Sequence, residues 1–230
     1  MKTFVVNLDK DRNRLAFVSD QLERLALPFE RFSAVYGRSL SPEEMRRSFR
    51  PIRSFIAMKK RMSRAEIGVA LSHIGCCRRM VEEKTPFALI LEDDVVFDER
   101  FPATLERVAD FLNPACPQIV ILSGYGVQDG PTHSEEIRPE RSAWCADAYC
   151  LTLPAAELIL RENFPVITVS DSFKRWRRRF GLELYRALPT TVRQDDVTFV
   201  SGNVVLPKSN WFVRNLMWLA DWFLWKVCKA

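Results

Sequence analysis

Three adjacent carboxylates, Glu92, Asp93 and Asp94, directly follow the apolar run 87–91. Such an unbroken apolar run is typical of a strand that is covered on both faces, and ligands of open α/β sheets collect at the carboxyl ends of strands. Neighbouring carboxylates repel one another unless a cation or several hydrogen-bond donors neutralise them. Oxygen ligands without Cys or His nearby favour Mg²⁺ or Mn²⁺ over Zn²⁺, and such an ion usually bridges to substrate phosphates. The alternative is a solvated acidic turn.

A second group of candidate residues lies on a predicted helix that starts near residue 63. The segment 63–66, Ser-Arg-Ala-Glu, is a capping box, in which the Ser and Glu side chains satisfy the first N–H groups of the helix. Gly68, Ser72 and Gly75 then form a ridge of small residues, which would let another backbone or a ligand approach closely. His73 lies beside this ridge and is one of only two histidines. The alternative to a role in ligand binding is a histidine that makes one structural hydrogen bond.

The elements that must position these residues alternate between strands and helices, which predicts an α/β fold with a mostly parallel sheet. Strands are predicted at Thr3–Leu8, Phe29–Val35, Phe87–Leu91, Ile119–Leu122 and Ala143–Leu153, and helices start near Asp11, Ser63, Phe101, Ala155 and Asp171. The segment 189–205 is predicted to hold short strands or loops.

Length and composition fit one ordinary α/β domain. The chain has 230 residues, of which 47% are hydrophobic and 27% are charged, so it can bury a core and is not disordered by composition. The six cysteines include an adjacent pair and form no C-x-x-C pair, which argues against a disulfide framework. The N-terminal apolar run is too short for a signal peptide. We therefore expect a cytoplasmic protein.

Four segments occur in an order and spacing that belong together. They are Val6-Asn7-Leu8 followed by Arg12 and Arg14, Ala34-Val35-Tyr36-Gly37, Glu66-Ile67-Gly68-x-Ala70-Leu71-Ser72-His73, and Leu89-Ile90-Leu91-Glu92-Asp93-Asp94-Val95. Together they resemble the family 25 glycosyltransferases, the lipooligosaccharide galactosyltransferase group that also includes the collagen galactosyltransferase domains. The resemblance covers residues 2–201 and is strongest over residues 1–100. It implies a nucleotide-sugar-binding fold of the GT-A type, a UDP-sugar donor (usually UDP-galactose), Mn²⁺ or Mg²⁺, and inversion at the anomeric carbon.

The same resemblance implies roles for individual residues. Asp94 is the main metal ligand, with Asp93 and Asp195 as further ligands, while Glu92 or Asp93 meets the ribose or a metal-bound water. The implied donor-binding set is Asn7, Arg12, Arg14, Ser72, His73, Glu92, Asp93 and Gln194. Arg12 and Arg14 could equally be cations on a helix surface.

An inverting transfer also needs a base for the acceptor hydroxyl. Asp171 matches the family's acid that opens a helix after a Pro-containing loop, and the alternative is a plain acid at a helix N-terminus. The chain departs from the family at one point, because it has Cys-Ala-Asp-Ala-Tyr at 145–149 where the family usually has Gly-Thr-x-Ala-Tyr. The missing Gly and Thr put a sugar or acceptor contact in doubt. Asp147 could replace that contact or compete with Asp171 as the base.

Basic segments and an aromatic tail indicate the partners. Segment 38–62 is a basic excursion in which Pro42 and Pro51 argue against one continuous helix, and Lys174 starts a second cationic run that ends at Arg179. Dense arginine suits phosphate recognition, and these charges fit a lipid-linked oligosaccharide acceptor on an anionic membrane surface. No nucleic-acid-binding motif is present. Residues 208–230 are amphipathic and rich in Trp, which predicts an interfacial helix; the alternative is a helix that packs on protein.

These observations predict a glycosyltransferase domain over residues 1–207, followed by an amphipathic tail. The predicted reaction moves a sugar, galactose by the resemblance, from a UDP-sugar to a lipooligosaccharide or LPS acceptor, at the inner face of the inner membrane. The alternatives are a degenerate family member that serves as a membrane-associated scaffold, and a hydrolase of nucleotide sugars.

Overall fold

A computed structural model describes residues 1–124 and 135–195. The predicted tail 208–230 lies outside the described residues, as does His133. In the described part of the chain, no helix combines the length and the apolar character that crossing a membrane requires.

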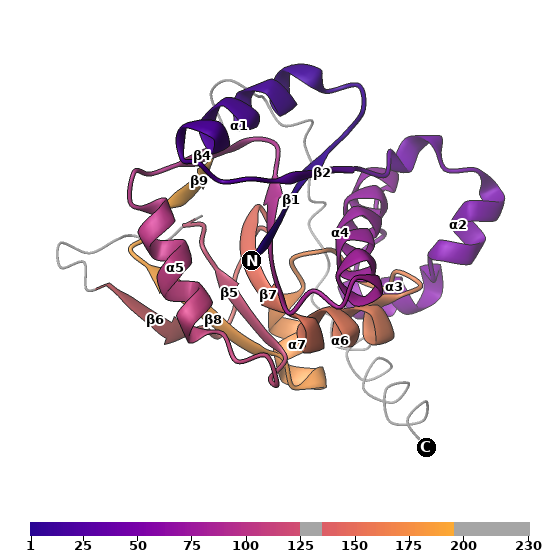
Figure 1. The fold of residues 1–230 in the computed structure, drawn as a ribbon. Coiled ribbons are helices and arrows are strands. Elements are labelled where there is room, and N and C mark those ends of the chain that lie inside the picture. Colours follow the sequence, from indigo (N-terminus) through magenta and orange to yellow (C-terminus); the bar gives the residue numbers. More distant parts are fainter. Residues whose placement is uncertain (125–134, 196–230) are drawn as a thin grey trace.

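A seven-stranded sheet forms the centre of the molecule (Figure 1). Its strands in spatial order are β2 (Glu30–Ser33), β1 (Lys2–Asn7), β3 (Phe87–Glu92), β7 (Ala148–Thr152), β5 (Gln118–Ile121), β8 (Glu183–Leu188) and β6 (Glu136–Pro139). β7 and β6 run antiparallel to their neighbours, and the other five strands share one direction. The predicted α/β class with a mostly parallel sheet is confirmed.

Helices cover both faces of this sheet (Figure 1). One face carries α4 (Arg64–Glu82), α6 (Leu153–Asn163) and α7 (Phe173–Phe180), and the other carries α1 (Arg12–Arg24) and α5 (Phe101–Phe111). Successive strand residues alternate between the two layers, so that Ile90 packs in the α4–α6 core and Leu91 in the α1–α5 core. Burial on both faces explains why the run 87–91 is apolar without interruption.

A small second sheet pairs β4 (Val95–Phe97) with β9 (Val192–Gln194) in antiparallel register. Gln21 of α1 holds β4 in place, because its amide donates to the Val95 carbonyl at 3.0 Å and accepts from the Phe97 N–H at 3.2 Å. This pairing brings the chain around Gln194 beside the end of β3. It therefore places the late segment of the sequence at the acidic turn.

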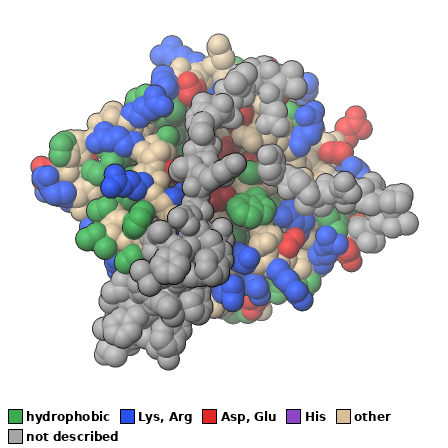
Figure 2. Space-filling model, turned by 180° about the vertical axis from the view of Figure 1, so that it is seen from behind, with side chains coloured by type: hydrophobic (Ala, Val, Ile, Leu, Met, Phe, Trp, Pro, Cys, Tyr) green, Lys and Arg blue, Asp and Glu red, His purple; other side chains and the backbone are tan. Residues whose placement is uncertain are grey.

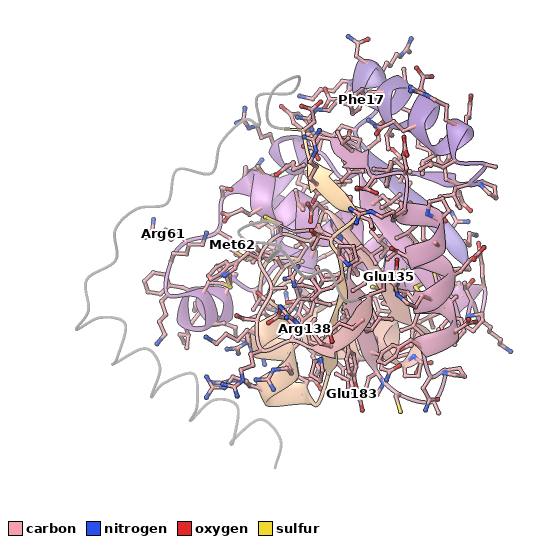
Figure 3. All side chains as sticks on the ribbon, turned by 90° about the vertical axis from the view of Figure 1, so that its left-hand side faces the viewer. Phe17, Arg61, Met62, Glu135, Arg138 and Glu183 are labelled. Carbon is pink, nitrogen blue, oxygen red and sulfur yellow. The ribbon has the colours of Figure 1, made fainter. Side chains whose placement is uncertain are left out.

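The basic excursion contains η1 (Gly37–Ser39), α2 (Pro42–Ser48) and α3 (Pro51–Met58). Each α-helix begins at its proline, because proline lacks the N–H that the first helical residue leaves unpaired. The predicted interruption of the helix is confirmed. Arg61 and Met62 connect α3 to α4 (Figure 3), with Arg61 exposed and Met62 buried.

The predicted capping box of α4 is confirmed. Ser63 Oγ accepts from the Glu66 N–H at 3.2 Å, and the Ser63 N–H donates to Glu66 Oε2 at 2.7 Å. The small residues of α4 were predicted to let either another backbone or a ligand approach closely, and at Gly68 the structure shows a backbone. A Cβ on Gly68 would lie 2.5 Å from the Val35 carbonyl oxygen, so only glycine allows this approach.

The predicted element list was incomplete. Strands β4, β6 and β8 were not predicted, β7 starts at Ala148 instead of Ala143, and α7 starts at Phe173 instead of Asp171. β4 is three residues long and β6 is a polar edge strand, so neither carries an apolar period of its own. These strands form because a partner strand is present, and the sequence pattern alone does not reveal the partner.

Candidate functional site

Three strands deliver polar residues to one edge of the sheet. β1 and β3 are parallel, so Asn7 and Glu92 at their carboxyl ends lie at the same edge. β7 is antiparallel to β3, so its beginning lies there too, and the Glu92 N–H donates to the carbonyl of Asp147 at 2.8 Å. The antiparallel strand thus adds Asp147 to the carboxylates that follow β3.

Asn7 and Arg14 hold Asp93. Asn7 Nδ2 donates to Asp93 Oδ2 at 2.6 Å, and Arg31 Nε donates to Asn7 Oδ1 at 3.0 Å. Arg14 Nη1 lies 3.1 Å from Asp93 Oδ1 and 3.2 Å from Asp94 Oδ2. Arg14 therefore lies within the acidic cluster, and its predicted contact with the donor stays a prediction. Burial still raises the pKa of Asp93, against the opposing effects of Asn7 and Arg14.

Asp94 is buried beneath the segment that β9 brings in. Gln194 Nε2 donates to Asp94 Oδ2 at 3.1 Å, and the Asp195 N–H donates to the Asp94 carbonyl at 2.7 Å. Burial, followed by the charge of Glu92, raises the pKa of Asp94 to about 6. The other oxygen, Asp94 Oδ1, is buried and has no hydrogen-bond partner in the described part of the chain.

An unpaired, buried carboxylate oxygen in a cluster of acids fits a cation, because an unsatisfied buried group is costly. Within residues 1–124 and 135–195, however, no three His, Cys, Asp or Glu side chains are arranged so that they could hold a metal ion together. These residues fit a divalent ion that takes further ligands from a phosphate substrate and water. The predicted metal roles of Asp94, Asp93 and Asp195 stay predictions.

Asp147 is 2% exposed, and its Oδ1 accepts from Ser123 Oγ at 2.6 Å. Burial raises its pKa to about 6, and the charges of Glu92 and Asp94 act in the same direction. Arg186 fixes Ser123 by donating to its carbonyl oxygen, and Arg186 Nε also donates to Glu140 at 3.0 Å. Asp147 is thus a carboxyl group with raised proton affinity, held in one orientation.

Asp171 lies just before α7 and accepts from the Cys145 N–H at 3.3 Å. Burial raises its pKa, and the charge of Glu92 adds to the rise. Cys145 has a φ of 67°, a left-handed conformation that few residues other than glycine adopt. This strained residue connects the loop before Asp147 to Asp171, so the two candidate bases are joined through a short stretch of backbone.

His73 reaches the cluster from α4. Its Nδ1 lies 2.9 Å from the hydroxyl oxygen of Tyr149, and its Nε2 lies 3.5 Å from Glu92 Oε1. Ser72 is different, because its hydroxyl accepts from the Val35 N–H at 2.8 Å and donates to the Gly68 carbonyl at 2.8 Å. Ser72 therefore joins α4 to the chain after β2, and its predicted contact with a donor stays a prediction.

A cavity of about 590 Å³ adjoins Asn7 on the side of α1, and this volume falls within the range of small-molecule sites. Arg12 lines it, whereas Arg14 of the same helix faces the acidic cluster. The lining residues are Asn7, Asp9, Arg12, Leu15, Ala16, Ser19 and Arg31. Arg12 thus lies where a ligand could enter beside the carboxylates.

The sequence did not single out several residues that orient the site. Ser123 ends a buried apolar strand, and this position at a strand end could have signalled it. Arg31 and Arg186 lie within strands, and their partners become visible only when the strands are paired. Tyr149 stands in the segment where the chain departs from the family pattern, yet its link to His73 depends on the packing of α4 against β7.

Comparison with known proteins gives a family match over most of the chain. The sequence model of glycosyltransferase family 25 (LPS biosynthesis protein) matches residues 1–141. A glycosyltransferase 25 family member from Drosophila pseudoobscura pseudoobscura is 30% identical over 148 residues, which are 63% of this chain and 22% of that protein. One from Aedes aegypti is 32% identical over 110 residues, 46% of this chain and 18% of that protein.

A procollagen lysyl hydroxylase and glycosyltransferase from Acanthamoeba polyphaga mimivirus is 28% identical and aligns with 89% of this chain and 26% of its own length. The chain thus spans about a fifth to a quarter of the length of these relatives. Among solved structures, A197 from STIV has a TM-score of 0.46 at 14% identity, covering 90% of this chain and 98% of its own. A glycosyltransferase involved in glycosylation of the major capsid of PBCV-1 has a TM-score of 0.39 at 10% identity, covering 96% and 98%.

Proposed function

Because the chain belongs to glycosyltransferase family 25, we propose that it is an inverting glycosyltransferase. In this proposal it moves a sugar, galactose, from a UDP-sugar to a lipooligosaccharide or LPS acceptor. The observation that carries the proposal is the acidic cluster at the sheet edge, where a buried oxygen of Asp94 has no hydrogen-bond partner among the described residues. Family membership supplies the reaction class, and the cluster supplies groups with the required chemistry.

The donor would bind along the edge between α1 and β3. Its nucleoside would enter the cavity that Arg12 lines, with its diphosphate toward Arg14 and Asp94. A Mn²⁺ or Mg²⁺ ion held by Asp94, with Asp93 or Asp195, would neutralise the charge that develops on the leaving diphosphate. Arg14 contributes to the same end, because a guanidinium suits phosphate oxygens.

Asp171 is the residue that we assign as the general base. A base removes the acceptor proton most effectively when its pKa lies near the working pH, and burial raises the pKa of Asp171 toward that range. Asp147 has a raised pKa as well, but it is 2% exposed and one of its oxygens accepts from Ser123. Asp171 is therefore better placed to meet an acceptor hydroxyl, and Asp147 is better placed to orient the backbone beside it.

The acceptor would approach over the basic surface formed by the excursion 38–62 and α7. The two are joined through the chain before α7, because the Arg50 N–H donates to the Val166 carbonyl at 3.0 Å and the Val166 N–H donates to the Ser48 carbonyl at 2.7 Å. Arg46 and Arg47 of α2 and Lys174 and Arg178 of α7 are exposed, and Lys and Arg side chains are visible across the face that Figure 2 shows. Such a surface suits the phosphates of a lipid-linked acceptor and an anionic membrane.

Titration of UDP with and without Mn²⁺ tests the donor site. The wild type should bind UDP more tightly with Mn²⁺, and Asp94→Asn should lose this difference while keeping its thermal unfolding transition. Asp98→Asn is the matched control, because it removes the charge of a partly exposed carboxylate that pairs with Arg100. If the wild type binds no UDP under either condition, the scaffold alternative replaces the transferase.

Mass spectrometry of products identifies the reaction itself. The full chain is incubated with a panel of UDP-sugars and a truncated lipooligosaccharide. Transfer of one hexose from UDP-galactose to the acceptor supports the proposal. Release of free sugar with no change in acceptor mass would instead favour the hydrolase.

A further inference from the structure

Two buried side chains connect Tyr149 of β7 to Glu92 at the end of β3. Tyr149 and His73 are 2% and 4% exposed. The Tyr149 hydroxyl oxygen lies 2.9 Å from His73 Nδ1, and His73 Nε2 lies 3.5 Å from Glu92 Oε1. The two rings are stacked with centroids 5.8 Å apart. The imidazole is thus fixed between a hydroxyl group on one side and a carboxylate on the other.

The hydrogen bonds available to His73 and Tyr149 favour one protonation state of the imidazole. If Nε2 carried no proton, its lone pair would face a carboxylate oxygen in a buried site, which is repulsive. If both ring nitrogens carried protons, the buried Tyr149 hydroxyl would have to accept from Nδ1, and its own proton would have no acceptor within the described residues. Only the neutral ring with its proton on Nε2 lets Tyr149 donate to Nδ1 and lets Nε2 donate toward Glu92.

Glu92 is the most exposed of the three adjacent carboxylates. Its side chain is 28% exposed, against 10% for Asp93 and 4% for Asp94. His73 faces Oε1, and Oε2 makes no hydrogen bond with any residue that the structure describes. A carboxylate oxygen in this setting accepts from a hydroxyl group.

We propose that Tyr149 and His73 act as positioning residues, which orient Glu92 so that its free oxygen accepts a hydrogen bond from a hydroxyl of the nucleotide sugar. At this 3.5 Å separation the buried Nε2 makes no hydrogen bond with a described residue, and contacts of this kind often shorten when substrate binds. The identity of the ligand rests on the proposed function, whereas the proton on Nε2 follows from the buried contacts alone.

The same tyrosine connects the array to the candidate base. Tyr149 meets Phe173 edge to face with ring centroids 5.6 Å apart, and Phe173 lies two residues after Asp171. Phe173 in turn packs on Trp176 at 5.6 Å. One aromatic cluster therefore fixes both the imidazole that orients Glu92 and the start of α7. Tyr149→Phe keeps these ring contacts and removes only the hydroxyl group.

Nitrogen NMR of histidine-labelled full-length protein tests the protonation state. The chain has two histidines, so the His73 signals are assigned by their loss in His73→Gln. The expected result is a protonated Nε2 and a bare Nδ1 in the wild type, and a mixture of tautomers in Tyr149→Phe. A wild-type His73 with its proton on Nδ1, or on both nitrogens, would overturn the inference.

Kinetics test the effect on Glu92. Loss of a group that orients a metal ligand typically costs 10–100-fold in metal sites, and from this range we expect kcat/KM for the donor to fall about tenfold in Tyr149→Phe. His73→Gln, which retains an N–H near the Nε2 position, should keep more activity than His73→Leu. Tyr185→Phe is the matched control, because it removes a tyrosine hydroxyl that donates to Glu183 at 3.1 Å, and it should behave as the wild type.

Deoxy analogues of the UDP-sugar identify the hydroxyl. One analogue should bind the wild type more weakly than the parent donor, and Glu92→Ala should remove that difference. The positioning role is wrong if the wild type is active and Tyr149→Phe has the same kcat/KM, or if every analogue binds the wild type as tightly as the parent donor does. Either result leaves the proposed transferase function intact. A wild type that binds and turns over no UDP-sugar overturns the proposed function and, with it, the ligand assigned to Glu92.

Discussion

Replacement of Asp147 by Asn should stabilise the protein at neutral pH. Asp147 is 2% exposed, and burial raises its pKa from 3.8 to about 6. The charge of Glu92 raises this pKa further, and so does that of Asp94. Ionisation of the Asp147 carboxyl group is therefore unfavourable in the folded protein. Asn has nearly the same shape and carries no charge. The Asn oxygen can still accept from Ser123 Oγ.

The size of the effect follows from linkage. One pKa unit corresponds to about 1.4 kcal/mol, so a rise from 3.8 to about 6 destabilises the folded protein by up to about 3 kcal/mol at pH 7. The folded state binds this proton more tightly than the unfolded state. The favourable contribution of the protonated group is therefore complete below pH 3.8 and is lost as the pH rises through about 6.

Thermal unfolding of the wild type and Asp147→Asn at pH 7 and near pH 4 measures the difference. For a chain of this length about 2–4 °C corresponds to 1 kcal/mol, so the Tm should rise by up to about 12 °C at pH 7 and change little near pH 4. Asp98→Asn should do the opposite at pH 7, because Arg100 lowers the pKa of Asp98 to about 2. An Asp147→Asn protein that is no more stable than the wild type at pH 7 would refute this account of the cluster.

Three further outcomes are expected. Gly68→Ala should lower the free energy of unfolding by about 1–3 kcal/mol in urea, because its Cβ would lie 2.5 Å from the Val35 carbonyl oxygen; Val69→Ala on the exposed face of α4 is the control. The transfer rate should fall as the pH drops through the raised pKa of Asp171, and in Asp171→Asn a residual rate, if measurable, should lose this limb of the pH profile. A double charge reversal at Lys174 and Arg178 should weaken binding to anionic vesicles in a flotation assay. Equal binding by the wild type and the variant would show that α7 is not part of the membrane-binding surface.

The sequence predicted those parts of the fold that carry their own periodicity. The apolar run 87–91 predicts a strand that is buried on both faces, as the structure has it, and the capping box predicts where α4 begins. β4 and β6 have no such pattern and exist because another strand pairs with them. The antiparallel direction of β7 likewise depends on which neighbours it joins, and alternation of strands and helices predicts a parallel one.

The candidate site was predictable as a set of residues but not as an arrangement. Adjacent carboxylates at a strand end indicate a candidate ligand site, with a solvated acidic turn as the alternative, and the family pattern adds Gln194 and Asp195. The sequence does not reveal that β9 places Gln194 against Asp94, or that Ser72 is engaged by backbone groups. These facts depend on contacts between segments that are far apart in the chain, and side-chain types do not encode them.

The acidic cluster departs from the rules that stabilise the rest of the molecule. Burial raises the pKa of Asp93, Asp94 and Asp147 together, so three neighbouring carboxyl groups are each harder to ionise than in water. A fold retains such a cost when the site needs the charges for a ligand. Arg14 offsets part of the repulsion by pairing with Asp93 and Asp94, but Asp94 Oδ1 has no partner in residues 1–124 and 135–195. In the proposed function, a cation and a diphosphate would stabilise these same carboxylates, so UDP with Mn²⁺ should raise the Tm of the wild type more than that of Asp94→Asn.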